Sequence, residues 1–108
     1  MIFTFDVDKR ISASTNAIAN TAGGLPFDSV GNLVIADDTA APARLLNGWP
    51  LDASGAVAID YGGTTVRNQN GSPFTSSGRL AVDETNPVEG FSNGIPYTSS
   101  GISISIPA

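Results

Sequence analysis

Residues 71–82 read Gly-Ser-Pro-Phe-Thr-Ser-Ser-Gly-Arg-Leu-Ala-Val, and the same order of residue types returns three more times along the chain. The related segments are 24–35, 48–59 and 94–105. Their prolines stand at positions 26, 50, 73 and 96, and their second glycines at 31, 55, 78 and 101, so both series are spaced by 24, 23 and 23 residues. Self-similarity at a fixed period of this length is the signature of a repeat architecture. The sequence therefore predicts four copies of one unit.

Each copy predicts short β-strands. An Asn-Gly pair precedes the proline in three copies and favours the positive φ of a tight turn. The proline cannot donate a ladder hydrogen bond, so it belongs at a strand start or an edge. After the second glycine the residues alternate, with Leu80 and Val82 on one face and Ala81 on the other. We expect an all-β fold made of short-stranded repeats.

The size of the unit bears on how the copies assemble. A unit with two short strands cannot enclose a core of its own, and we expect four of them to hold too little apolar material for a thick monomeric sandwich. Two architectures follow: the units stack as a β-solenoid-like body within a single chain, or three chains wrap as a β-prism, and we favour the intertwined homotrimer. The small side chains on the second face of the strand are the expected trimer-packing residues: Val34, Ala58 and Ala81.

The fourth copy departs from the other three. Its apolar residues Ile102 and Ile104 are shifted by one position relative to Leu80 and Val82. Because side chains alternate along a strand, a shift of one residue turns the apolar set to the opposite face. We therefore expect the last strand to cap the body or to meet a different surface.

The first 22 residues contain no copy of the repeat. We divide the chain into an N-terminal attachment strand or arm, residues 1–22, and a repeat body, residues 23–108. Phe3, Phe5 and Val7 alternate on one face of an expected strand. Residues 9–22 are expected to be extended or irregular, and a short helix is the alternative. Such a strand exposes ladder groups and apolar side chains, which favours pairing with another chain. The alternative is that these side chains close one end of the trimer.

The composition excludes several classes of function. The 108 residues indicate one domain, and ten acidic against five basic residues, a net charge of −5, argue against nucleic-acid binding. Without Cys or His there is no thiolate nucleophile, no disulfide and no imidazole base. The single lysine, Lys9, follows no Gly-rich loop, and no G-x-S-x-G elbow occurs. We expect no enzyme activity, no catalytic residue, no cofactor and no metal.

The sequence carries no membrane or export signal that we recognise. Asp6 and Asp8 interrupt the first residues before an apolar signal region forms, and no apolar run is long enough to span a membrane.

Three other polar or aromatic residues receive structural interpretations. Trp49, the only tryptophan, precedes a repeat proline, where packing against the turn is favoured over a platform for sugars. Arg44 and Arg67 form an expected exposed row, and pairing with a row made by Asp60 and Asp83 is the alternative.

The pattern L-P-[FT]-[DST]-x-x-G-x-L-x-V, with Asn-Gly before it, resembles repeats in bacteriophage virion proteins. Such repeats occur in head decoration (cement) proteins and in small head or tail fibre proteins. Residues 25–35 and 72–82 match best, and the resemblance covers residues 23–108. The fourth copy, with Ile-Ser-Ile-Ser-Ile, departs from the pattern.

The resemblance implies a structural protein of the virion. We expect a decoration protein on the outer surface of the phage head, where it binds the major capsid protein and stabilises the capsid. The alternative is a short head or tail fibre, or adhesin, that recognises a host surface glycan. No nucleic acid or membrane partner is expected. The expected capsid contacts lie in the N-terminal arm: Ile2, Phe3, Phe5, Val7, Lys9 and Arg10.

Overall fold

The computed structural model of the chain describes residues 4–36, 40–46, 48–61, 64–69, 72–92 and 94–105. Among them are thirteen strands and no helix, so the expected all-β class is confirmed. The molecule measures 31 × 30 × 25 Å along its principal axes. The strands are β1 (Ile11–Ser14), β2 (Asn20–Ala22), β3 (Leu25–Phe27), β4 (Leu33–Val34), β5 (Arg44–Leu46), β6 (Trp49–Leu51), β7 (Ile59–Tyr61), β8 (Arg67–Gln69), β9 (Ser72–Phe74), β10 (Leu80–Asp83), β11 (Gly90–Ser92), β12 (Ile95–Thr98) and β13 (Gly101–Ser105).

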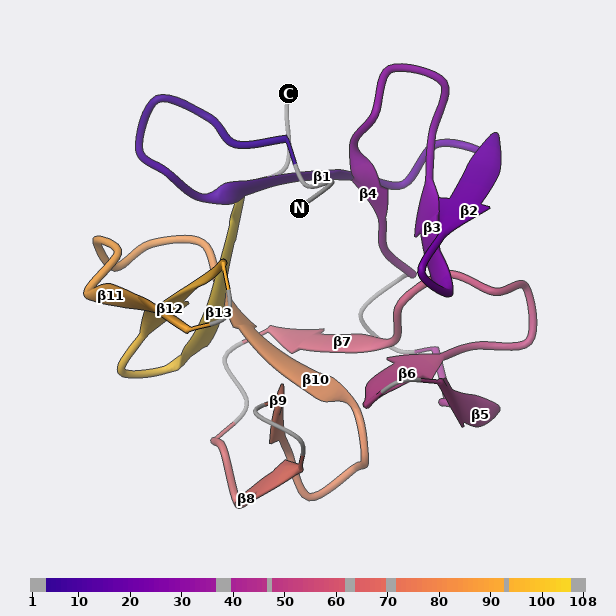
Figure 1. Cartoon of the computed structure of the whole chain (residues 1–108). Coiled ribbons are helices and arrows are strands. Elements are labelled where there is room, and N and C mark those ends of the chain that lie inside the picture. The colour runs from indigo at the N-terminus through magenta and orange to yellow at the C-terminus, as the bar shows by residue number, and fades with distance from the viewer. Residues whose placement is uncertain are drawn as a thin grey trace.

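Four antiparallel hairpins project from the body (Figure 1). We call their first strands, β2, β5, β8 and β11, the outer strands, and their second strands, β3, β6, β9 and β12, the inner strands. The turns between them use positive φ, as at Gly48 (86°) and Gly94 (82°). The repeat proline lies in each inner strand, where it has no N–H to donate but its carbonyl can accept a hydrogen bond. The Pro50 carbonyl, for example, accepts a hydrogen bond from the Ala58 N–H at 2.8 Å.

A tight turn leads from each inner strand to a strand of the body. In the first of these turns the Asp28 N–H donates to the Asn32 carbonyl, and the Gly31 N–H donates to the Asp28 carbonyl. Gly31 has a φ of 92°, and Gly55 (94°) and Gly78 (82°) occupy the same place in the next two turns. This conformation explains the second glycine of the motif, because residues with a Cβ adopt it at a cost.

The strands that follow these turns, together with β1, form a ring of parallel pairs, seen around the centre of Figure 1. We call them the core strands: β1, β4, the stretch from Val57 through β7, β10 and β13. Each pairs with one neighbour through its first half and with the next through its second half. The registers are Ala13 with Leu33, Ile35 with Val57, Ile59 with Leu80, Val82 with Ile102, and Ile104 with Ile11.

Val34, Ala36 and Ala56 form a small buried apolar cluster, and a much larger one lies among the core strands. Each core strand contributes two alternate side chains to it, and the inner strands add Leu25, Phe27, Trp49 and Leu51. Burying one such side chain is worth about 1.5–3 kcal/mol. The apolar faces predicted for copies one to three are therefore confirmed, and the expectation that one chain holds too little material for a core is wrong. The core-strand residues are Ile11, Ala13, Leu33, Ile35, Val57, Ile59, Leu80, Val82, Ile102 and Ile104, each at most 3% exposed.

The expected reversal of the fourth copy is also wrong. Ile102 and Ile104 lie in the same cluster as Leu80 and Val82. The shift is absorbed in the turn: Phe74 pairs with Leu80, six positions later, whereas Tyr97 pairs with Ile102, only five positions later. A turn shortened by one residue compensates the displaced pattern, so the side chains keep their face.

Residues 4–14 repeat the second half of a unit, which we call the first unit, so the expectation that the first 22 residues hold no repeat is wrong. The expected strand through Phe5 and Val7 is wrong as well, because the chain turns at residues 6–10. Phe5 pairs with Ile11 as Phe27 pairs with Leu33. The Asp6 N–H donates to the Arg10 carbonyl and the Lys9 N–H to the Asp6 carbonyl, which reproduces the turn at Asp28. Lys9 stands in the place of Gly31 and has a φ of 68°. The sequence boundary between residues 22 and 23 falls inside the β2–β3 hairpin.

Candidate docking surface

The described residues contain no group of three or more His, Cys, Asp or Glu side chains that could hold a metal ion. In this described part, no helical segment has the length and apolar character needed to cross a bilayer.

Two exposed aromatic side chains meet where the two ends of the repeat series adjoin. Phe5, from the first unit, and Phe91, from outer strand β11, lie with ring centroids 6.3 Å apart and an interplanar angle of 69°. Phe5 is 39% exposed and Phe91 is 53% exposed. Val7, in the turn that follows Phe5, is 98% exposed. Exposed aromatic side chains of this kind are enriched in binding sites.

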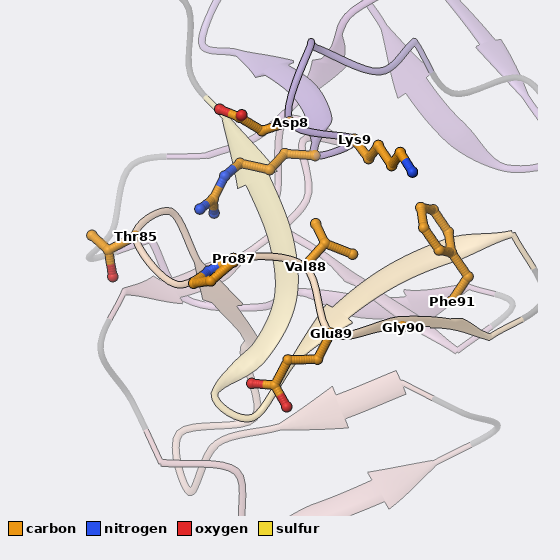
Figure 2. A pocket seen from close by; sticks show the side chains of 9 residues that line it. Asp8, Lys9, Thr85, Pro87, Val88, Glu89, Gly90 and Phe91 are labelled. Atoms are coloured by element: carbon orange, nitrogen blue, oxygen red, sulfur yellow. The ribbon is translucent and has the colours of Figure 1, made fainter.

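A groove of about 650 Å³ adjoins the two rings. The turn at Asp8, Lys9 and Arg10 forms one wall, and the chain from Thr85 to Phe91 forms the other. Figure 2 shows the Lys9 side chain extending above Val88 on the side of Phe91. The Glu89 carboxylate points away from Lys9. We call Phe5, Phe91 and this groove the junction surface.

Arg10 fixes the wall of the groove from within. Arg10 is only 8% exposed. Its guanidinium donates hydrogen bonds to the Asp83 carbonyl at 3.3 Å and to the Ser103 hydroxyl at 3.2 Å. It also donates to the Asn86 carbonyl. These bonds join the first unit to β10, β13 and the chain that follows β10, so Arg10 is a structural residue of the junction.

The turn itself is held by the Asp6 carboxylate. Burial alone would raise the pKa of Asp6, but the backbone N–H of Arg10, the Ser105 hydroxyl and the backbone N–H of Asp8 bond to the carboxylate and lower the pKa below its usual value. Asp6 therefore stays ionised at neutral pH and fixes the conformation that presents Val7, Asp8 and Lys9.

Two buried carboxylates elsewhere have the same kind of role. Burial alone would raise the pKa of Asp28, but the Ser14 hydroxyl at 2.7 Å and the backbone N–H of Asn32 outweigh burial and hold the pKa well below its usual range. For Asp83 burial is likewise outweighed, by the Thr85 N–H and by the Thr98 hydroxyl at 2.7 Å. Donors surround both carboxylates, so they fasten neighbouring units together and are unsuited to proton transfer.

The predicted contact residues divide into three groups. Ile2 and Phe3 lie outside the described residues. Phe5, Val7 and Lys9 are exposed, and the structure brings them to the junction surface or to the turn beside it. Arg10, by contrast, is occupied inside the chain.

The predicted trimer-packing residues are buried within one chain. Val34, Ala58 and Ala81 are 3%, 0% and 0% exposed, so other parts of the same chain already cover them. Contacts between copies would have to use other side chains.

The remaining sequence interpretations have clear outcomes. Trp49 was predicted to pack against the turn; the structure places it in the apolar core, where it is 6% exposed. Arg44 and Arg67 are exposed, as predicted, and the ion pair of Asp60 is formed with Arg79 instead, at 3.7 Å.

Sequence reasoning missed Phe91 as a surface residue. The sequence signal that could have identified Phe91 is its position in the outer strand, opposite the repeat proline. The residues at this position are Thr21, Leu45, Asn68 and Phe91, and only Phe91 is aromatic.

Comparison of the chain with protein-family models, with curated proteins and with solved structures finds no match.

Proposed function

We propose that this chain is a non-enzymatic bacteriophage virion protein that decorates the outer surface of the head and docks on the major capsid protein through the junction surface. The observation that carries the proposal is the exposed Phe5–Phe91 pair beside a groove, built on the N-terminal segment expected to make the attachment. The motif resemblance supports a virion role. The net charge of −5 suits an outer surface that does not bind packaged DNA.

The experiment is a binding assay on bare capsids. The double variant Phe5→Ser with Phe91→Ser should lose capsid binding and keep the fold, because both side chains are partly exposed. Val30→Ser is the matched control, since Val30 is an apolar side chain in another turn and is 72% exposed. Equal binding by the double variant and the control would overturn the proposal.

The alternative is a short fibre or adhesin that recognises a host surface glycan. The groove favours this alternative because it combines an aromatic ring and an ammonium group, at Phe91 and Lys9. The number of copies per purified virion separates the two functions: hundreds of copies indicate head decoration, and about a dozen indicate a fibre.

The assembly state is a separate part of the proposal. The core strands of one chain form a ring in place of the expected β-prism or β-solenoid-like body. We propose that three such rings assemble as a homotrimer. Exposed apolar side chains outside the junction surface are the candidates for contacts between copies: Leu45, Leu46 and Val66, at 47%, 39% and 56%.

A further inference from the structure

A second groove lies between two units of the ring. We number the units after the first by their strands: β2–β4 form the second, β5–β7 the third, β8–β10 the fourth and β11–β13 the fifth. The groove has a volume of about 420 Å³ and lies between residues 15–18, which lead into the second unit, and the turn of the third unit at Asp52, Ser54 and Ala56. Residues 34–36 line it as well. We call it the 2–3 groove.

A carboxylate and a hydroxyl group join neighbouring units at four places in the ring. One partner follows the second apolar residue of a core strand, and the other lies in the turn of the next unit around the ring. The distance between the hydroxyl and carboxylate oxygens is 2.7 Å in two pairs and 3.2 Å in a third. The four pairs are Ser14 with Asp28, Thr98 with Asp83, Ser77 with Asp60, and Ser105 with Asp6.

Asp28 shows how such a carboxylate divides its two oxygens. Its Oδ1 accepts the backbone N–H groups of Val30 and Asn32 at 3.0 and 2.9 Å and so holds the turn. Its Oδ2 accepts the Ser14 hydroxyl from the neighbouring unit. Oδ1 therefore serves the backbone of the turn, and Oδ2 serves side-chain donors, including the one that joins the units.

The contact between the second and third units keeps the carboxylate and lacks the hydroxyl. Asp52 begins the turn here, and its Oδ1 accepts the N–H groups of Ser54 and Ala56 at 2.9 and 3.0 Å and the Ser54 hydroxyl at 2.7 Å. Ala36 has the position that Ser14 has in the first unit. Among the described residues no donor bonds to Oδ2 of Asp52. Asp52 therefore brings an unused acceptor to the wall of the 2–3 groove.

The surroundings of Asp52 indicate the chemistry of the donor that fits there. Val34, Ala36 and Ala56 form a buried apolar cluster beside it, and Ile18, 36% exposed, lines the same groove. A saccharide combines hydroxyl donors with apolar C–H faces. We propose that the 2–3 groove binds a neutral saccharide, one of whose hydroxyl groups donates to Oδ2 of Asp52, as serine and threonine hydroxyls do at the other contacts. This site does not rest on the proposed function.

The charges that the structure describes at the groove favour a neutral ligand. The Arg44 guanidinium accompanies the Asp52 carboxylate, because it lies 4.0 Å from the place that a Cβ on Gly55 would take. A cation at this turn would be repelled by Arg44, and an anion would be repelled by Asp52.

The test is a titration of the ¹⁵N-labelled full chain, followed by NMR. The probes are methyl α-glucopyranoside, methyl α-mannopyranoside, methyl β-galactopyranoside and N-acetylglucosamine, each raised to about 50 mM. We expect at least one of them to cause saturable shifts of the Ser54 and Ala56 N–H signals, because both groups donate to Asp52. The N–H signals of Val30 and Asn32, which donate in the same way to Asp28, are the internal control and should not move.

Three variants test the role of Asp52. Asp52→Asn keeps an acceptor at Oδ1 and replaces Oδ2 by an amide group, so it should weaken saccharide binding about tenfold or more. Ala36→Ser supplies the missing hydroxyl from within the chain. It should weaken binding to a similar extent and raise the melting temperature by a few degrees. Ala53→Ser changes an exposed alanine of the same turn and is the matched control, with binding and melting temperature unchanged.

Several outcomes would overturn the proposal. They are the absence of shifts at Ser54 and Ala56 with every saccharide, equal shifts at Val30 and Asn32, and equal binding by Asp52→Asn and Ala53→Ser. Larger shifts with methylammonium chloride than with the saccharides would show that the site takes a cation. If Ala36→Ser does not fold, Asp52→Asn decides alone. The Phe5→Ser, Phe91→Ser double variant should bind the saccharide normally, so loss of its capsid binding bears only on the proposed function.

Discussion

Ile11 lies opposite Ile104 in a parallel strand pair, so the first and last core strands join each other. β1 also pairs with β4, the next core strand along the chain, and β13 also pairs with β10, the core strand before it. The stability of the whole body therefore depends on an interaction between segments at opposite ends of the sequence.

Removal of the Arg10 side chain should weaken the closure. In Arg10→Ala the carbonyls of Asp83 and Asn86 lose a charged donor in a buried place. We expect a loss of about 2–4 kcal/mol in the free energy of unfolding, measured by urea denaturation. The exposed Arg44→Ala is the control and should change it by less than about 0.5 kcal/mol.

Lys9 should be replaceable by glycine with a gain in stability. Its φ of 68° is a conformation that costs a residue with a Cβ about 1 kcal/mol, and glycine adopts it at Gly31, Gly55 and Gly78. Lys9→Gly should therefore raise the melting temperature by a few degrees. Lys9→Ala keeps the Cβ and should not; a similar rise in both variants would show that the charge, and not the backbone, is responsible.

Gly101 should not tolerate a methyl group. Its φ is 141°, and an added Cβ would meet the carbonyl group of Ala81 well inside contact distance. Gly101→Ala should cost about 2–4 kcal/mol in the free energy of unfolding. Gly90→Ala is the matched control, because a Cβ there meets nothing within 4 Å.

Acid should destabilise the protein through Asp28 and Asp83. Both carboxyls have a pKa in the folded chain well below the ordinary value of 3.8. A lowered pKa stabilises the fold fully above the ordinary value, and this contribution is lost as the pH falls below about 4 toward the lower, folded-state pKa. The urea midpoint should therefore fall steadily from about pH 5 to about pH 2. Asp28→Asn should be less stable at neutral pH and should show a shallower fall.

Ala81 distinguishes packing within a chain from packing between chains. Because Ala81 is fully buried in one chain, Ala81→Arg should unfold that chain, at a cost of about 4 kcal/mol or more. The loss should be the same at all protein concentrations, whereas an effect on a trimer would grow on dilution. Sedimentation equilibrium of the unaltered chain gives the mass of the assembly directly, and a monomer mass would contradict the homotrimer.

Local patterns in the repeats were sufficient to predict short strands and much of the core, whereas the strand expected through Phe5 and Val7 is a turn. The alternation at Leu80, Ala81 and Val82 fixes which side chains are buried, because strand side chains alternate whatever the partner strand is. Turn residues such as Gly78 could be read in the same way, since the φ they adopt is a property of the residue itself.

The closure and the first unit could not be predicted in this way. Pairing of Ile11 with Ile104 leaves no local signal. The first unit lacks the motif's second glycine, with Lys9 in its place, and Thr4 stands where the other units have proline. The matching pairs Phe5-Asp6 and Phe27-Asp28 were the available signal. The exposure of Phe5 follows from the surrounding strands and not from the residue type.

The pairing of β1 with β13 makes the packing cyclic while the covalent chain stays linear. A circular permutant whose ends open in the connector at residues 40–43, and whose present ends are joined by a flexible linker, retains every core-strand register. In such a permutant the units follow one another in a different order along the polypeptide and keep the same arrangement in space.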